Sequence, residues 1–267
     1  MSWSERQQAM LEAMGLRVWT APPLAEPEPA VPEPPVPAKV EAPAPVRVAS
    51  VLPQIVAPAQ PATAALPQAP AAAGAVAAMD WTQLREAVAG CRACGLCEGR
   101  KHTVFGVGHE RAHWMVVGEA PGEQEDLQGE PFVGQAGKLL DSMLRAIGLT
   151  RADGPPEQQV FIANTLKCRP PRNRNPEPEE LAQCEPYLNR QIALVQPRII
   201  LAMGRFAVQS LLRSSEPIGR LRGRVHEYQG VPLIVTYHPA YLLRNLVDKA
   251  RAWEDLCLAM DVLQRKT

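Results

Sequence analysis

Short apolar segments that alternate with helical patterns are the feature of this sequence that most constrains its fold. The apolar segments predict buried strands at 114–117, 160–163, 198–202 and 231–236. Helical patterns follow at 138–147, 178–195, 205–212 and 250–263. Strands that alternate with helices form a parallel sheet with helices on both faces. The sequence therefore predicts an α/β fold with three layers, α/β/α, and a central, mostly parallel sheet.

The N-terminal part of the chain has a different composition. Residues 21–78 contain 15 Pro and 19 Ala and show no periodicity. This is typical of a disordered, partly polyproline linker, which we place at 21–79. Before it, apolar residues at helical spacing predict a short helix at 3–19, within a separate segment at 1–20. Two interpretations remain open, because the tail is either dispensable or a tether for a peptide that binds a partner protein.

The folded domain is expected at 80–267, where Asp80 and Gln83 match the capping box that begins a helix. The formal net charge of the chain is zero and favours no partner, although a nucleic-acid enzyme needs only a local basic surface. The sequence shows no apolar run of about 18 residues and no secretory signal. We therefore expect a cytoplasmic protein whose six cysteines are metal ligands or core residues rather than disulfides.

Unusual polar residues follow the predicted strands. The segment GEAPG at 118–122 follows the first strand, Asn164 the second, Gly204 the third and His238 the last. In a parallel sheet the carboxyl ends of the strands share an edge, and ligands bind outside that edge. A Gly- and Pro-rich turn after one strand is weak evidence by itself. Glu, Asn and His delivered to the same edge are stronger evidence, and they predict a functional site there.

Four cysteines in two pairs form a candidate metal site. The pairs are Cys91 with Cys94, in a C-x2-C turn, and Cys168 with Cys184. Four thiolates can hold either a tetrahedral zinc ion or a [4Fe–4S] cluster, and the spacing alone does not decide between them. Cys97 makes a second C-x2-C with Cys94 and is a rival ligand. Cys257 has apolar neighbours at helical spacing, which favours a core position.

Five motifs stand out along the chain: CRAC at 91–94, VVGEAPGEQED at 116–126, EPFVGQAG at 130–137, NTLKCRPPRNRNP at 164–176 and HPAYLLRN at 238–245. Together they resemble the family 4 uracil-DNA glycosylases, the iron–sulfur branch of the uracil-DNA glycosylase superfamily. Their order and spacing fit the family, and the resemblance runs from about Asp80 to the C-terminus. It implies an enzyme that flips uracil out of DNA and hydrolyses its N-glycosidic bond, which leaves an abasic site for base excision repair.

The resemblance also implies the metal group and the DNA-binding residues. The metal group is a structural [4Fe–4S] cluster, and its ligands are Cys91, Cys94, Cys168 and Cys184. The loop between the last two cysteines is basic and suits DNA phosphates. The candidate phosphate contacts are Arg169, Arg172, Arg174 and, later in the chain, Arg244. A solvated loop that makes no contact with DNA is the alternative.

Three residues suit recognition and chemistry on the flipped base. Phe132 is the expected stacking ring, with plain core packing as its alternative. The amide of Asn164 can donate to uracil O4 and accept from N3–H, which cytosine cannot match, although a turn role would also explain an Asn there. A neutral His238 can donate to uracil O2, where negative charge develops as the bond breaks. The alternative for His238 is a simple turn residue.

The turn after the first strand departs from the G-Q-D-P-Y of better-known uracil glycosylases. Ala120 stands in the place of the water-orienting Asp, so we expect a dissociative path in which water captures the sugar cation. Glu119 is expected to help hold the water or the cation, and a structural hydrogen bond in the turn is its alternative. Gly122 replaces the Tyr that excludes thymine, and Glu125 is the residue expected to fill that space.

Two rival functions remain at this stage: a non-catalytic iron–sulfur DNA-binding module that serves a polymerase, and a glycosylase for another base such as hypoxanthine. The candidate uracil-binding residues argue against a non-catalytic module, which would not need them. Nothing in the sequence excludes secondary base substrates. No lysine occupies a nucleophile's place in a motif, which favours a monofunctional glycosylase. We expect a monomer that acts on uracil-containing DNA, with residues 1–20 as a candidate contact for a repair or replication protein.

Overall fold

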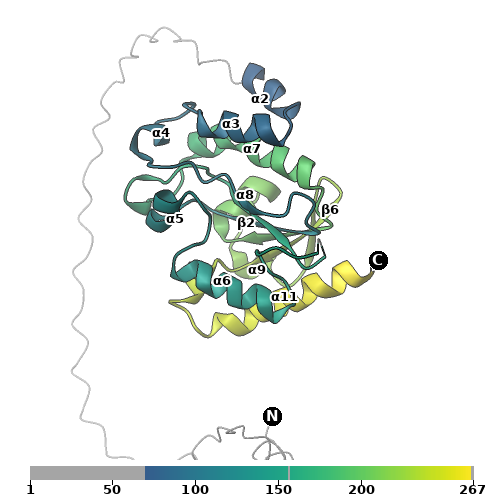
Figure 1. The fold of residues 1–267 in the computed structure, drawn as a ribbon. Helices are drawn as coiled ribbons and strands as arrows, with labels where there is room; N and C mark the ends of the chain where they lie inside the picture. Colours follow the sequence, from purple (N-terminus) through teal and green to yellow (C-terminus); the bar gives the residue numbers. More distant parts are fainter. Residues whose placement is uncertain (1–69, 156, 266–267) are drawn as a thin grey trace, which may run out of the picture. The chain divides into compact units, whose positions relative to one another are not determined.

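The computed structural model describes residues 70–155 and 157–265, which contain a six-stranded mixed sheet in the order β1-β3-β2-β4-β6-β5 (Figure 1). The four central strands are parallel, and β1 and β5 are antiparallel edges. The strands are β1 (Val107–Gly108), β2 (Trp114–Gly118), β3 (Val160–Asn164), β4 (Ile199–Met203), β5 (Val225–Tyr228) and β6 (Val231–Thr236). The four central strands match the predicted apolar segments to within one residue at each end.

Helices cover both faces of this sheet (Figure 1). They are α2 (Pro70–Ala77), α3 (Trp81–Ala89), α4 (Leu96–Gly99), α5 (Glu123–Gln128), α6 (Gln135–Ala146), α7 (Pro178–Val195), α8 (Arg205–Leu212), α9 (Ile218–Leu221), α10 (Pro239–Leu242) and α11 (Asp248–Arg265), with a short 3₁₀ turn, η1 (Pro171–Asn173). Two hydrophobic cores result. One lies between the sheet and helices α3, α7 and α8, and the other lies between the sheet and helices α6 and α11.

Strand β2 shows how the sequence builds these two cores. Met115 and Val117 belong to the core with α7 and α8, whereas Trp114 and Val116 belong to the core with α6 and α11. Successive strand residues point to opposite faces of a sheet. An uninterrupted apolar strand therefore needs cover on both sides, and this confirms the predicted three-layer α/β/α arrangement.

The start of the folded domain agrees with the predicted capping box. The Asp80 amide donates to Gln83 Oε1 at 3.0 Å, and the Gln83 amide donates to Asp80 Oδ1 at 2.9 Å. The structure differs just before this point, because the last part of the predicted linker forms helix α2. Val76 of α2 is buried in the core that lies between the sheet and helices α3, α7 and α8. The rest of the linker and the predicted helix at 3–19 lie outside the described residues.

The edge strands were not predicted, and their burial explains why. β1 has two residues, both half-buried, and β5 alternates exposed and half-buried residues without a fully buried position. Such strands lack the apolar run that reveals a central strand. In the described part of the chain, no helix is long and apolar enough to cross a membrane.

Candidate active site and cysteine pocket

The carboxyl ends of β2 and β3 bring three predicted residues together. Gly118 at the end of β2 is paired in register with Asn164 at the end of β3. A Cβ atom added to Gly118 would lie 2.4 Å from Asn164 Oδ1 and 2.6 Å from Phe132 Cζ. The Asn164 amide and the Phe132 ring therefore both contact Gly118, and this position requires glycine because a side chain would collide with them.

Asn164 carries an unpaired acceptor at this edge. Asn164 is 2% exposed, and Oδ1 has no hydrogen-bond partner among the residues that the structure describes. A buried acceptor without a donor costs about 1–3 kcal/mol, so such groups are rare unless a ligand or a water molecule satisfies them. The arrangement provides a fixed acceptor for an N–H group that enters beside Phe132.

The Phe132 ring lies against the His238 imidazole. The two ring centroids are 5.3 Å apart with an interplanar angle of 28°. Phe132 has a φ of +56°, which is uncommon for a bulky residue and indicates a strained backbone. Helix α6 packs closely behind it, since a Cβ at Gly137 would lie 1.7 Å from the Phe132 carbonyl oxygen. The ring is therefore held in place by its surroundings.

Glu125 holds the loop that carries Phe132. Its carboxylate accepts from the amides of Gly122 at 3.1 Å, Val133 at 3.0 Å and Gly134 at 3.1 Å. These bonds join the turn after β2 to the start of α6. Glu125 therefore stabilises the loop, a role that the sequence did not reveal. Its predicted role in excluding thymine remains a prediction.

His238 is held as a neutral imidazole at the end of β6. Its Nδ1 accepts from the Ala240 amide at 3.2 Å, so the ring proton lies on Nε2. The pKa of His238 is lowered to about 4, mainly because of burial, with Glu125 opposing this effect and Arg244 adding to it. Gly204, with a φ of +92°, makes room at the end of β4, because a Cβ there would lie 3.1 Å from the His238 Cβ.

The turn after β2 places a perturbed carboxyl group near the same edge. Burial raises the pKa of Glu119 to about 7, and Arg205 opposes this rise. The Glu119 carbonyl accepts from the Leu166 amide at 3.1 Å, which fixes the turn against the segment after β3. Ala120 is partly exposed and packs against a small cluster that includes Cys168 and Cys184.

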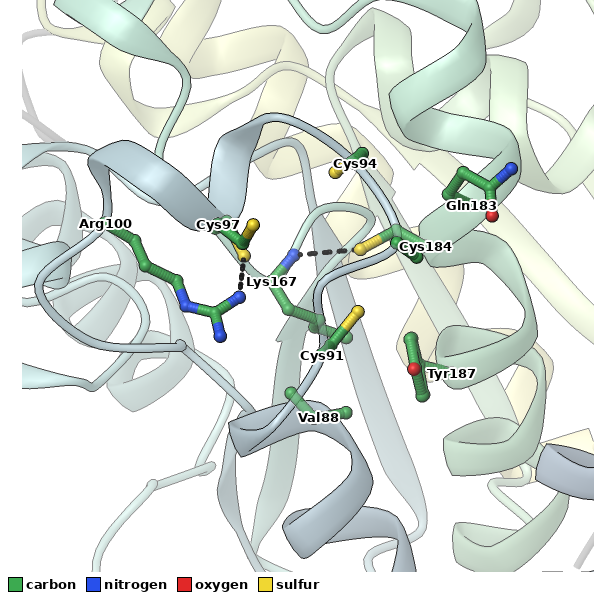
Figure 2. Close-up of a pocket in the computed structure, with 11 residues that line it drawn as sticks. Val88, Cys91, Cys94, Cys97, Arg100, Lys167, Gln183, Cys184 and Tyr187 are labelled. Carbon is green, nitrogen blue, oxygen red and sulfur yellow. Dashed lines mark hydrogen bonds between the residues drawn. The ribbon is translucent and has the colours of Figure 1, made fainter. Parts of the chain in front are cut away.

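The cysteines predicted as ligands line one pocket with Cys97 (Figure 2). The figure shows the sulfur atoms of Cys91, Cys94 and Cys184 turned towards a common space. Among the described residues, no three His, Cys, Asp or Glu side chains form a group that could hold a metal ion. The four predicted thiols thus line one pocket without standing close enough together to bind a single ion, and Cys257 is not among the lining residues.

Two donors contact the pocket sulfurs. Arg100 Nη1 donates to Cys168 Sγ at 3.1 Å, and the Lys167 amide donates to Cys184 Sγ at 3.4 Å. Burial raises the pKa of Cys184 to about 12 and also raises that of Cys168. A cation that replaced the thiol protons would stabilise the thiolates in this buried place. Arg100 was not predicted, because nothing in its local sequence distinguishes it from a surface arginine.

Lys167 is the second residue that the sequence reasoning missed. Its side chain is 2% exposed, and Nζ donates to the Asn164 carbonyl and to Gln191 Oε1, each at 2.7 Å. Burial lowers its pKa to about 8, and the thiols of Cys184 and Cys168 oppose this effect. The lysine in the NTLKC motif was the available signal. Its Nζ is bound by two acceptors, one from the main chain and one from a side chain.

The basic loop after Cys168 is partly used for internal contacts. Arg174 pairs with the buried carboxylate of Glu180, with Nη1 to Oε2 at 2.9 Å, and this hydrogen bond lowers the pKa of Glu180. Arg169 Nε donates to Asn173 Oδ1 at 2.8 Å. Arg172 is exposed with a φ of +53°. Of the three, Arg172 therefore projects most freely, and Arg174 has a structural contact that the sequence did not predict.

Comparison with known proteins gives a family match over 105–257, to the uracil DNA glycosylase superfamily. The chain is 47% identical over 161 residues to a type-4 uracil-DNA glycosylase of Archaeoglobus fulgidus, covering 57% of this chain and 78% of that protein. It is 41% identical to proteins of the same description from Pyrobaculum aerophilum (67% of this chain, 93% of that protein) and Thermotoga maritima (62% and 84%).

Proposed function

The chain belongs to the type-4 uracil-DNA glycosylases of the uracil-DNA glycosylase superfamily, and on this premise we propose how its residues excise uracil. It is a hydrolase of N-glycosyl bonds that acts in DNA repair. The observation that carries the residue assignment is the buried, unpaired Oδ1 of Asn164 beside the stacked rings of Phe132 and His238. The site has a ring face, a hydrogen-bonding edge and a neutral N–H donor.

Uracil recognition needs the base outside the duplex, because its edge and its glycosidic bond are inaccessible within the stack. Phe132 supplies a face for the flipped base. Asn164 accepts from uracil N3–H through Oδ1 and donates to O4 through its amide nitrogen. Cytosine has an acceptor at N3 and a donor at the adjacent position, so it would leave both polar groups of Asn164 unpaired in a buried site.

His238 stabilises the departing base. Breaking the bond from uracil N1 to C1′ leaves negative charge on the base, largely at O2. Nδ1 of His238 is already an acceptor, so Nε2 carries the N–H that is available to a ligand. A pKa of about 4 keeps the ring neutral near pH 7. It can therefore donate a hydrogen bond without first carrying a charge of its own.

Ala120 leaves no carboxylate in the place where related enzymes orient water, which favours a dissociative path. The glycosidic bond breaks first, and water then adds to the sugar cation. Glu119 lies beside Ala120 with a pKa of about 7. In its ionised form it stabilises the cation and holds the attacking water. The product is an abasic site and free uracil.

The cysteine pocket holds a [4Fe–4S] cluster in this proposal. The chemistry of the donor set fits, because four thiols of the predicted pairs line one pocket, and Arg100 and the Lys167 amide donate to two of the sulfurs. Each thiolate of such a cluster binds a different iron atom, so the ligands stand around a larger core than a single ion needs. When bound, the cluster ties the 91–94 turn to the loop before α7.

The finer partner and location assignments also belong to this proposal. We infer that the enzyme acts as a cytoplasmic monomer on uracil-containing DNA and that residues 1–20 contact a repair or replication protein. Exposed Arg172 and Arg244 are the most accessible of the four candidate phosphate contacts.

The proposed function is tested with purified full-length protein and labelled oligonucleotides that differ at one position. Alkali after incubation should reveal abasic sites where the position is uracil, and no strand cleavage where it is cytosine or thymine. Equal cleavage at uracil and at hypoxanthine would favour the alternative function, a glycosylase that also acts on other bases. Absence of cleavage at uracil by folded, iron-loaded protein would contradict the proposal.

A further inference from the structure

Lys167 is a charged residue in a buried position, which is energetically unfavourable. The side chain is fully enclosed between β3 and α7, and none of the carboxylate salt bridges in the described part of the chain includes it. A buried ammonium without a carboxylate partner costs several kcal/mol of desolvation. An apolar residue of similar length would fill the same volume without that cost. The hydrogen bonds that the ammonium donates are therefore the feature that distinguishes a lysine at this position.

Those donors hold the backbone of the residue proposed to read uracil. Nζ donates to the Asn164 carbonyl at 2.7 Å, directly beside the Cα from which the recognition amide projects. The second acceptor, Gln191 Oε1, is also 2.7 Å away, and Gln191 Nε2 donates to the Phe105 carbonyl at 2.8 Å. Gln191 is completely buried, so the ammonium is anchored to two separate parts of the core.

The main chain of Lys167 completes a rigid frame. Its carbonyl accepts from the Val104 amide at 2.8 Å, and its amide donates to Cys184 Sγ. The Thr165 amide, in the same peptide unit as the Asn164 carbonyl, donates to the Gly118 carbonyl at 3.1 Å. The peptide unit that follows the Asn164 Cα is therefore held at both its carbonyl and its N–H, while no described residue pairs with Asn164 Oδ1. Such preorganisation keeps a recognition group in place before the ligand arrives.

We propose that Lys167 is a positioning residue for uracil recognition, which acts by holding the Asn164 carbonyl and thereby fixing the direction of the Asn164 amide. The inference rests on the proposed role of Asn164. It makes Lys167 a specificity determinant that never contacts the base, and it assigns to Gln191 the task of anchoring the ammonium.

The test measures how strongly each protein prefers a flipped uracil. Two duplexes are compared, identical except for 2′-fluoro-deoxyuridine, which resists cleavage, or thymidine at one position. The ratio of the two Kd values reports base recognition, and the Kd for the thymidine duplex reports general DNA binding. Lys167→Met should lower the preference for uracil by at least about tenfold, because a recognition group displaced by 1 Å loses most of its effect. Its thymidine-duplex Kd should match that of the wild type.

Two further variants keep the test decisive. Gln191→Leu removes the second anchor and leaves Lys167 intact, and it should lower the preference in the same direction by a smaller factor. Lys138→Met removes an exposed lysine from α6 and should change nothing. Absorbance near 400 nm and iron content should equal those of the wild type in each variant, since none of them removes a thiol.

The outcomes separate this inference from the proposed function. If Asn164→Asp loses the preference but Lys167→Met keeps it, the inference is overturned and the role of Asn164 stands. If Asn164→Asp also keeps the preference, the proposed role of Asn164 fails. If Lys167→Met does not fold, Gln191→Leu decides, and an unchanged preference in that variant overturns the inference.

Discussion

At the scale of single residues, the site separates recognition from bond breaking. Asn164 presents a buried acceptor that has no hydrogen-bond partner in the described part of the chain. His238 presents a donor that stays neutral because burial lowers its pKa. Glu119 differs from both, since burial raises its pKa to about 7 and places its titration near neutral pH. Each residue therefore makes a prediction of its own.

Asn164→Asp replaces the donor that faces uracil O4 with an acceptor. Lone pairs would then face each other in a buried site, which costs about 1–3 kcal/mol and corresponds to a loss of roughly 5–150-fold in affinity for the flipped base. Discrimination against cytosine should fall as well. Single-turnover rates on uracil and cytosine oligonucleotides measure both effects, and unchanged selectivity would show that another residue reads the base edge.

The raised pKa of Glu119 leads us to predict how the rate of the chemical step depends on pH. With a folded-state pKa of about 7, the carboxylate is mostly protonated at pH 6 and mostly ionised at pH 8. If the ionised form stabilises the sugar cation, the single-turnover rate should rise by about tenfold between these values and then level off. His238 adds no inflection, since its pKa of about 4 lies below this window. Glu119→Gln should give a slower, flat profile; a variant that kept the inflection would contradict this role.

At the scale of secondary-structure elements, the cysteine pocket joins segments that are far apart in the sequence. The 91–94 turn lies between α3 and α4, Cys168 follows β3 and Cys184 lies in α7. A group bound by all four thiols would restrain the basic loop between β3 and α7, which is already joined to α7 by the pair between Arg174 and Glu180.

The cluster assignment predicts a brown protein with broad absorption near 400 nm and about four iron atoms per chain. Cys184→Ser should lose the absorption together with folding and DNA binding, because a ligand and its cross-link are removed. Cys97→Ser should keep all three, although Cys97 also lines the pocket. Iron analysis and absorption spectra check both variants. A colourless, active protein with one zinc ion would refute the assignment.

The elements that the sequence predicted well are those defined by local patterns. The β2, β3, β4 and β6 strands are apolar runs, and the strand ends place Gly118, Asn164 and His238 at one edge by topology alone. Lys167 could not be found in this way, because a lysine is normally read as exposed. Its burial depends on Gln191, which lies 24 residues later in α7. The loop-forming part of Glu125 similarly depends on amides eight and nine residues away.

At the scale of the whole molecule, the described active-site residues all come from 118–238, and none comes from the N-terminal segment. Deletion of 1–69 should therefore leave uracil excision on short oligonucleotides nearly intact. A large loss of kcat in this truncated protein would show that the tail reaches the active site.

A longer deletion, of 1–79, provides the informative comparison. It also removes α2, whose Val76 is buried, and Met79, whose carbonyl accepts from Arg190 Nε at 2.6 Å. Exposing the surface under one buried valine costs about 1.5–3 kcal/mol. The 1–79 deletion should therefore unfold several degrees below the 1–69 deletion. Equal melting temperatures would mean that α2 adds nothing to the folded domain.

The central claim is that a neutral His238 stabilises the departing uracil, and single-turnover kinetics of His238→Ala at saturating enzyme test it most directly. Loss of one such donor typically lowers the rate by about 10²–10³-fold, or roughly 3–4 kcal/mol. We predict a loss of this size in the chemical step, with DNA affinity little changed. If His238→Ala and the wild type cleave uracil at the same rate, His238 is only the cap of α10, and the central claim is wrong.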